Sequence, residues 1–312
     1  MTTTGRPTDA RLRPALDAEW RTLDTPRAGR VGWYADESAT GPGSSRPLVL
    51  VHSLNAAPSA MEMKPLFERF RGRRPVLALD LPGFGRSERG DRDYTPERLA
   101  DAVEAVVLAQ GRGPVDVVAL SLGAEIAARA IARDPTRYAS LCMISPTGFS
   151  TRNPPTGPIV DGLERVIGRP WIGEPLFRAL TSEASIRFFL ARNFQDAPAE
   201  ELIAYAGESA RQPGARFAPL RFLAGRLFTP NAFDRLFAPL AIPALVLFDR
   251  DPNVRFDRLP DWLSARPHRT AVRIAPTLGL PHWEQPERCV AALESFWATE
   301  VEAGAASPAP TS

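Results

Sequence analysis

The 312-residue sequence predicts an α/β fold with a mostly parallel, doubly wound sheet and one inserted, all-helical segment. Short continuous apolar runs alternate with amphipathic segments over residues 47–146, and such runs are typical of strands that are buried on both faces. The same alternation returns after residue 240. Between residues 147 and 240 it stops, and helical patterns are separated by proline and glycine. This interruption predicts a helical cap over the sheet.

Each element follows from its own pattern. A short early strand begins near residue 31. Apolar runs then predict strands over residues 47–54, 75–85, 115–123, 138–146, 242–252 and 270–276. Amphipathic spacing predicts helices over residues 61–70, 95–110, 124–134, 255–266 and 284–301. The helix at 95 also carries start signals, because Thr95 can cap it and Pro96 suits its first position. Within the insertion we expect helices over 159–168, 183–194 and 199–212.

These patterns divide the chain into four parts. Residues 1–30 are polar and contain proline, and we expect a flexible lead-in. Residues 31–146 and 241–301 form the α/β core, and residues 147–240 form the helical cap. Residues 302–312 are small, polar and proline-bearing, so a disordered tail is expected.

Composition excludes several classes of function. The 38 basic and 36 acidic residues leave a net charge of only +2, which gives no field for nucleic acid or an anionic membrane. Cys142 and Cys289 lie in apolar surroundings and are interpreted as buried hydrophobic residues. No apolar run is long enough to span a membrane, and the N-terminus has no apolar signal region, so we expect a cytoplasmic protein. No glycine-rich phosphate motif or metal-ligand cluster is visible, so no cofactor and no metal are expected.

The segment "ALSLGAE" places Ser121 between a predicted strand and a predicted helix. A serine at such a sharp turn projects its hydroxyl above the sheet, and the next backbone N–H can help to stabilise an oxyanion. Ala119 and Gly123 are small enough to let the strand and helix approach closely. The simpler alternative is a serine that only caps the helix. We favour the nucleophile turn.

With these motifs in order, the chain resembles the α/β-hydrolase superfamily over about residues 30–300, in the serine-nucleophile branch with a helical cap. "LVHSL" is similar to the oxyanion-loop motif, "ALDLPGFGRS" to the D-x-P-G-x-G-x-S segment and "ALSLG" to the nucleophile turn. The α/β-hydrolase fold is therefore expected, with nucleophile, acid and base in that chain order. An aspartate nucleophile, as in haloalkane or epoxide hydrolases, is not expected because a serine holds this position.

The resemblance also implies the oxyanion donors and the acid. The donors would be the backbone N–H groups of Leu122 and Leu54, with Ser53 in place of the usual glycine. The acid lies just before a proline in the resembling motif "LVLFDRDP", which favours Asp251 as the residue that orients the base. Asp249 is the alternative acid. Both aspartates could instead serve only to form the turn.

The base is where the pattern departs from the family. The resemblance implies a histidine five residues before Glu284, but Gly279 holds that position and His282 follows three residues later. Either the loop is rearranged so that His282 serves Ser121, or the base is absent and His282 packs against the last helix. His268 precedes a strand and should lie at the opposite end of the sheet. We take Ser121, Asp251 and His282 as the expected catalytic residues.

The expected substrate is a small molecule. Phe189 and Phe194 in the cap are candidate pocket residues, as is His52, although a histidine in that motif is usually structural. The sequence therefore predicts a serine hydrolase of esters or related acyl bonds on an apolar, small to medium substrate. The alternative is a non-hydrolytic protein of the same fold that binds a ligand or acts as a lyase. Either a monomer or a homodimer is compatible with the sequence.

Overall fold

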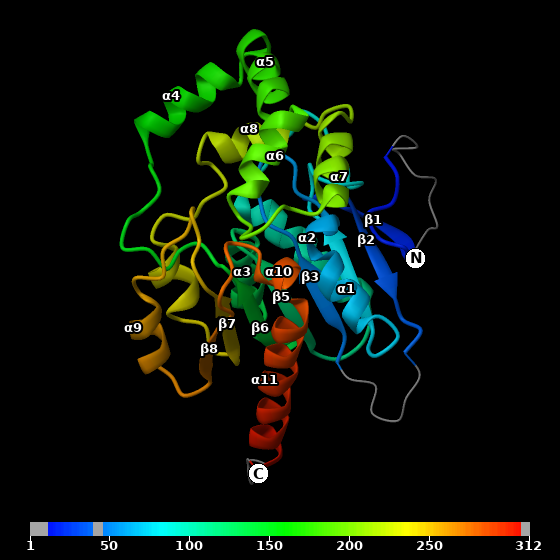
Figure 1. The fold of residues 1–312 in the computed structure, drawn as a ribbon, viewed down its shortest axis with the longest axis vertical. Coiled ribbons are helices and arrows are strands. Elements are labelled where there is room, and N and C mark those ends of the chain that lie inside the picture. Colours follow the sequence, from blue (N-terminus) through cyan, green and yellow to red (C-terminus); the bar gives the residue numbers. More distant parts are fainter. Residues whose placement is uncertain (1–11, 40–45, 307–312) are drawn as a thin grey trace.

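The computed structural model describes residues 12–39 and 46–306 (Figure 1). One sheet has the strand order β1-β2-β4-β3-β5-β6-β7-β8. Its strands are β1 (Glu19–Thr25), β2 (Gly29–Asp36), β3 (Leu48–Val51), β4 (Val76–Asp80), β5 (Val115–Leu120), β6 (Tyr138–Ile144), β7 (Ala244–Phe248) and β8 (Arg269–Arg273). The β1–β2 and β2–β4 pairs are antiparallel and all other neighbouring pairs are parallel, which confirms the predicted mostly parallel sheet.

Helices cover both faces of this sheet. Alternate residues of β3 enter different cores: Val49 and Val51 face one cluster, and Leu48 and Leu50 face the other. The first cluster packs under α2 (Pro96–Ala109), α3 (Gly123–Arg133) and α9 (Leu259–Ser264). The second packs under α1 (Lys64–Phe70) and α11 (Pro286–Ala306). Three short turns complete this core, namely η1 (Ala60–Met63), η2 (Pro135–Arg137) and α10 (Pro281–Glu284).

Between β6 and β7 the chain is helical. Figure 1 shows α4 to α8 together at the top of the view, beyond the end of the sheet. They are α4 (Pro158–Ile167), α5 (Pro170–Leu180), α6 (Glu183–Ala191), α7 (Glu200–Ala210) and α8 (Phe217–Leu223), followed by the π-helical turn η3 (Phe233–Phe237). The predicted cap helices correspond to α4, α6 and α7. The sequence reading missed α5 and α8, whose patterns are interrupted by Pro175 and Pro219.

The expected flexible lead-in is wrong for residues 12–30. This segment contains β1, which forms the edge of the sheet and pairs along its whole length with β2. Before β1, the side chains of Leu12, Ala15 and Leu16 are buried in the second core cluster. The strand escaped prediction because none of its side chains is fully buried and three of the seven are charged, as is usual for an edge strand. Residues 1–11 lie outside the described residues.

The C-terminal helix is longer than expected. α11 continues through Ala306, so residues 302–306 of the predicted tail are helical. Residues 307–312 of that tail lie outside the described residues. Over the described part of the chain, no helix is both long and apolar enough to cross a membrane.

Candidate active site

Ser121 lies directly after β5, where the chain turns into α3. Its backbone is in the left-handed region at φ 51°, which is unfavourable for a residue with a Cβ. The Ser121 N–H donates to the carbonyl of Ile144 at 2.8 Å and so fixes the turn to β6. Gly123 is required here by close approach, because a Cβ at this position would lie 2.3 Å from the His52 carbonyl oxygen. The local geometry is therefore that of the predicted nucleophile turn.

A cavity of about 380 Å³ lies between the carboxyl ends of the strands and the cap. The core contributes the loop after β3, the Ser121 turn, the turn after β7 and the loop after β8. The cap contributes an apolar wall that includes Leu180, Ile186, Phe189, Leu190, Leu202, Phe222 and Phe228. A cavity of this size and lining suits a small, mostly apolar molecule that is oriented by a few polar groups.

The two expected oxyanion donors line this cavity together with Ser121. Among the hydrogen bonds of the described residues, none is donated by the backbone N–H of Leu54 or Leu122. Ser53 also lines the cavity, and its N–H and hydroxyl donate to the carboxylate of Glu62 at 2.8 and 3.0 Å. Glu62 thereby holds the loop that carries the Leu54 N–H in place.

Glu62 is a cavity residue that the sequence analysis missed. Its carboxylate also accepts a hydrogen bond from Asn55 Nδ2 at 2.8 Å, and burial raises the pKa of Glu62. The residue lies in η1, within a segment that the pattern assigned to an amphipathic helix. The available signal was a single carboxylate between Met61 and Met63, both of which are buried. A charge between two buried side chains indicates a specific polar partner.

The two candidate acids have different surroundings. Asp251 lines the cavity, whereas the buried carboxylate of Asp249 is engaged by Arg273 Nε at 2.7 Å and by the Thr277 N–H at 2.8 Å. Burial opposes ionisation of Asp249, but these two donors lower its pKa. Burial raises the pKa of Asp251, against the effect of N–H groups from Asn253 and Val254. Of the two, Asp251 is the one whose carboxylate faces the cavity.

His282 does not line the cavity that contains Ser121. It lies in α10 with no exposed surface. Its Nε2–H donates to the carbonyl of Glu62 at 2.8 Å, and its Nδ1 has no hydrogen-bond partner among the described residues. Burial lowers the pKa of His282 to about 4, so the ring stays neutral near pH 7. The expected role of His282 as the base is therefore not supported: its ring packs against the core.

Gly279 occupies the place beside the acid. A Cβ built on Gly279 would lie 2.9 Å from Asp251 Oδ2 and 2.8 Å from Asn193 Oδ1. The φ angle of Gly279 is not in the left-handed region, so space and not backbone conformation restricts this position. The structure therefore has an acid at the cavity and a glycine, instead of an imidazole, next to it.

The predicted pocket residues separate into two groups. Phe189 lines the cavity, as expected. His52 and Phe194 do not belong to its lining, so their assignment to the pocket is not supported. His52 is fully buried: its Nδ1–H donates to the Ser53 carbonyl, and its Nε2 accepts from the Leu81 N–H at 2.9 Å. Both ring nitrogens are thus engaged by backbone, which explains its structural role.

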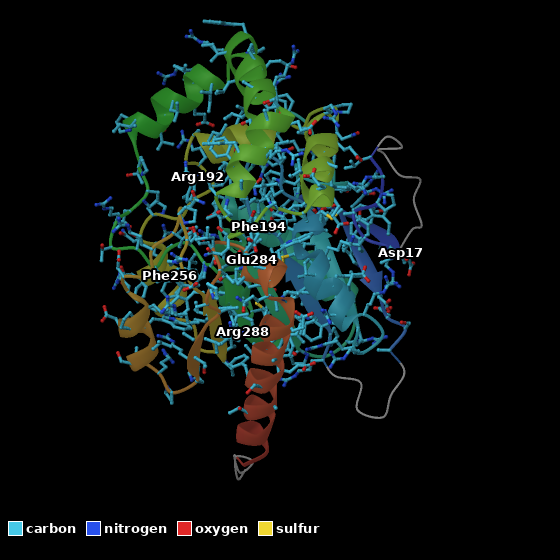
Figure 2. All side chains as sticks on the ribbon, in the orientation of Figure 1. Asp17, Arg192, Phe194, Phe256, Glu284 and Arg288 are labelled. Carbon is cyan, nitrogen blue, oxygen red and sulfur yellow. The ribbon has the colours of Figure 1, made fainter. Side chains whose placement is uncertain are left out.

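Phe194 packs into the core cluster beneath α1 and α11. The next residue, Gln195, donates its N–H to Glu284 Oε1 at 2.6 Å, and Leu278 donates its N–H to Glu284 Oε2 at 2.7 Å. Figure 2 shows Phe194 and Glu284 where the cap meets the last helices. Glu284 therefore joins the cap to the loop that contains Gly279. Asn193 and Asn253 also line the cavity, and no sequence pattern marked them.

These groups define the chemistry that the cavity can perform. It contains a serine hydroxyl on a strained turn, two backbone N–H groups with no acceptor among the described residues and one carboxylate with an available oxygen. Within the described ranges, no group of three or more His, Cys, Asp or Glu side chains could hold a metal ion. The arrangement has the parts of an acyl-transfer site, apart from a nitrogen base next to the acid.

Comparison with known proteins supports the family resemblance. Residues 48–292 match the model of the alpha/beta hydrolase family. A segment of 113 residues is 30% identical to a 1-acylglycerol-3-phosphate O-acyltransferase of Rattus norvegicus, over 35% of this chain and 32% of that protein. A 2-(acetamidomethylene)succinate hydrolase of Mesorhizobium japonicum is 25% identical over 59% of this chain and 60% of its own length. The matched part of this chain thus spans between about a third and three fifths of the length of these relatives.

Solved structures agree on the fold. A putative aryl esterase of Burkholderia cenocepacia superposes with a TM-score of 0.70 at 19% identity, covering 91% of this chain and all of that one. A bacterial membrane phospholipase A superposes with a TM-score of 0.69 at 21% identity, covering 90% and 86% of the two chains. At these identities the similarity concerns the arrangement of the chain.

Proposed function

Because the chain belongs to the alpha/beta hydrolase family, we propose that it is an acyl hydrolase that cleaves an ester or related acyl bond of an apolar molecule through Ser121. The observation that carries this proposal is the left-handed backbone of Ser121 at the wall of the cavity. A serine in this conformation costs on the order of 1–3 kcal/mol, and such strain is retained mainly at functional sites. The hydrolase activity named for the Mesorhizobium relative agrees with the proposal.

In this reaction Ser121 Oγ attacks the carbonyl carbon of the bound substrate. The developing oxyanion is held by the N–H groups of Leu54 and Leu122, which have no other acceptor among the described residues. Glu62 acts as a positioning residue, because its carboxylate fixes Ser53 next to one of these donors. The apolar cap wall binds the remainder of the substrate and excludes water.

The proposed reaction has one consequence for rate. A serine without an adjacent base is a weak nucleophile near neutral pH. Since Gly279 lies beside Asp251 and His282 donates to Glu62, simple esters should acylate Ser121 slowly. The acyl-enzyme should then accumulate, because water also needs a base to release the acyl group.

The Gly279 position favours one other candidate function. With no side chain beside Asp251, the protein could bind an apolar ligand in the cavity without cleaving it. In that case Ser121 would contribute a hydrogen bond to the ligand and no covalent bond.

Intact-mass analysis distinguishes the two functions. Incubation with p-nitrophenyl butyrate should add one butyryl group to the wild type, and peptide mapping should locate it on Ser121. Ser121→Ala should remain unmodified. A wild-type protein that binds the ester in the cavity but never gains the acyl mass would eliminate the hydrolase and leave the ligand-binding function.

A further inference from the structure

Hydrogen-bond acceptors border the part of the cavity that lies beside Gly279. Asp251 Oδ2 and Asn193 Oδ1 lie 2.9 and 2.8 Å from the position that a Gly279 Cβ would occupy. All three residues line the same cavity as Ser121. A carboxylate oxygen and an amide oxygen that face the same part of the cavity recognise a group that donates hydrogen bonds. A nitrogen with N–H bonds fits them best.

The orientations of both acceptors are fixed by other contacts. Asp251 Oδ1 accepts the N–H groups of Asn253 at 2.6 Å and Val254 at 2.9 Å, which leaves Oδ2 for the cavity. Asn193 Nδ2 donates to the Phe189 carbonyl at 2.9 Å, and Asn193 Oδ1 accepts from Asn253 Nδ2 at 2.9 Å. The amide of Asn193 therefore presents its oxygen, and not its nitrogen, to the space.

No cationic side chain of the described residues fills this role. None of the ion pairs formed by those residues includes Asp251, although its neighbour Asp249 pairs with Arg273. Arg192 is the one arginine of the cavity lining, and its guanidinium lies over the Phe188 ring at 6.0 Å from the centroid. Within this part of the chain Asp251 Oδ2 thus lacks a partner on the protein, as expected if a ligand supplies it.

We propose that the substrate itself carries a basic nitrogen that binds between Asp251 and Asn193 and serves as the proton acceptor for Ser121. This inference rests on the proposed function, since it assigns the substrate class of the same site. An imidazole, which is largely unprotonated near pH 7, could donate the N–H of one nitrogen to Asp251 Oδ2 and direct the lone pair of the other at Ser121 Oγ. In an ordinary triad the histidine side chain does both.

The steps balance without any further reactant. Ser121 Oγ forms a bond to the carbonyl carbon, its proton passes to the substrate nitrogen, and the carbonyl π pair moves to the oxygen beside Leu54 and Leu122. When the carbonyl re-forms, the bond to the leaving oxygen or nitrogen breaks and that atom takes the proton. Water then attacks the acyl-enzyme, giving its proton to the same nitrogen, which returns it to Ser121 Oγ as the acid leaves.

This order of steps restricts where in the substrate the basic nitrogen is attached. Both half-reactions need the base, and the leaving group departs after the first of them. A nitrogen in the leaving group would support acylation and then be lost, so the acyl-enzyme would stall. The substrate is therefore an ester or amide whose acyl half contains the basic nitrogen.

The first experiment supplies the base separately. The butyryl-enzyme is isolated, and its loss of acyl mass is followed with added imidazole or with pyrazole, a ring of the same shape that is much less basic. We expect imidazole, with saturation, to accelerate deacylation by about 100-fold over pyrazole. Gly279→Ala, whose methyl group would lie too close to both Asp251 Oδ2 and Asn193 Oδ1, and Asp251→Asn should both lose this saturable acceleration. Binding of imidazole, monitored by NMR, should weaken in the same two variants.

The second experiment compares three ethyl or butyryl esters. The ethyl ester of an imidazolyl alkanoic acid should turn over repeatedly, and its pyrazolyl isostere should not. The butyrate ester of an imidazolyl alcohol, supplied in equimolar amount and far below the concentration at which free imidazole acts, should acylate Ser121 once and then stop. Equal turnover of the imidazolyl and pyrazolyl acids would overturn the inference, as would an imidazole effect that Gly279→Ala leaves intact.

The two proposals fail in different ways. If no ester of the set ever acylates Ser121, the proposed hydrolase is wrong. If acylation occurs but neither imidazole nor an imidazolyl acyl group hastens deacylation, only the substrate-supplied base is wrong.

Discussion

At Ser121 the backbone stores strain that the fold must offset. The residue has φ 51°, and its N–H and carbonyl are both engaged, by Ile144 and Ala124. Neither contact involves the hydroxyl, so the strain belongs to the turn and not to the serine side chain. The same turn would be relaxed by a residue without a Cβ.

We therefore expect Ser121→Gly to be more stable than Ser121→Ala by about 1 kcal/mol, because glycine tolerates the left-handed region. Urea unfolding of the two variants measures the difference. Ser185 in helix α6 is the matched control. There the alanine variant should be the more stable one, since alanine is the better helix former. If the alanine variant is the more stable one at Ser121 as well as at Ser185, the Ser121 turn is unstrained.

His282 gives a residue-scale prediction on pH. Its folded pKa is about 4, below the ordinary value of 6.5, so its contribution to stability is fully present above pH 6.5. That contribution is lost as pH falls from 6.5 towards 4, because the unfolded chain takes up the proton first. His52 has the same shift for the same reason, burial. Each histidine accounts for a loss of about 3 kcal/mol over this range.

The variant His282→Gln keeps an N–H donor for the Glu62 carbonyl but cannot titrate. Its free energy of unfolding should fall less than that of the wild type between pH 7 and pH 4.5, by on the order of 2 kcal/mol. Ser121 should still be acylated by p-nitrophenyl butyrate. A folded His282→Gln protein that no longer acylates would restore His282 to the catalytic residues.

At the scale of elements, one carboxylate ties the loop after β8 to the cap. Glu284 accepts the N–H groups of Leu278 and Gln195, and burial raises its pKa. Gly279 follows Leu278 directly. The position of the space beside Asp251 therefore depends on this contact.

Replacing Glu284 with glutamine puts an NH₂ group where one of two N–H donors needs an acceptor. We expect Glu284→Gln to lose about 2 kcal/mol of stability and to increase amide hydrogen exchange at Leu278 and Gln195. Glu287→Gln, on the exposed side of α11, should change stability by less than about 0.5 kcal/mol. Unchanged protection at Leu278 would mean that other contacts hold the loop.

The elements also show what sequence can and cannot predict. The buried strands were predictable because both of their faces are apolar. The start of α2 was predictable because Thr95 caps it. β1 was missed because an edge strand has no such pattern, and α5 because Pro175 lies inside it. Motifs marked Ser121 and Asp251, and both residues line the cavity. Asn193 and Glu62 were not marked by any motif, because their roles arise from contacts between segments far apart in sequence.

On the scale of the whole molecule, the cavity and a buried polar network lie at opposite ends of the sheet. Ser121 follows the last residue of β5, whereas Asp116 lies near its start. Asp116 forms a buried ion pair with Arg74 and accepts the Ser140 hydroxyl at 2.6 Å. Trp297 of α11 donates to the same Ser140 oxygen at 3.1 Å. This network anchors the last helix to the sheet, away from the cavity.

Removing one member should destabilise the fold without altering the site. Asp116→Asn leaves the Arg74 charge buried and unpaired, which should cost about 3–5 kcal/mol. The rate of Ser121 acylation per folded molecule should stay the same at a temperature well below the unfolding transition. Thermal unfolding and intact-mass kinetics on the same sample measure the two quantities. A slower acylation in the folded variant would contradict this separation.

Glu62 connects the two core walls of the cavity. Its carbonyl accepts from His282 and Trp283, while its carboxylate holds Ser53 and Asn55. Because one residue bonds to both walls, a displacement of one wall should be transmitted to the other. Ligand binding should therefore change amide hydrogen exchange in the loop after β3 and in the turn at His282 together, even where the ligand contacts only one of them.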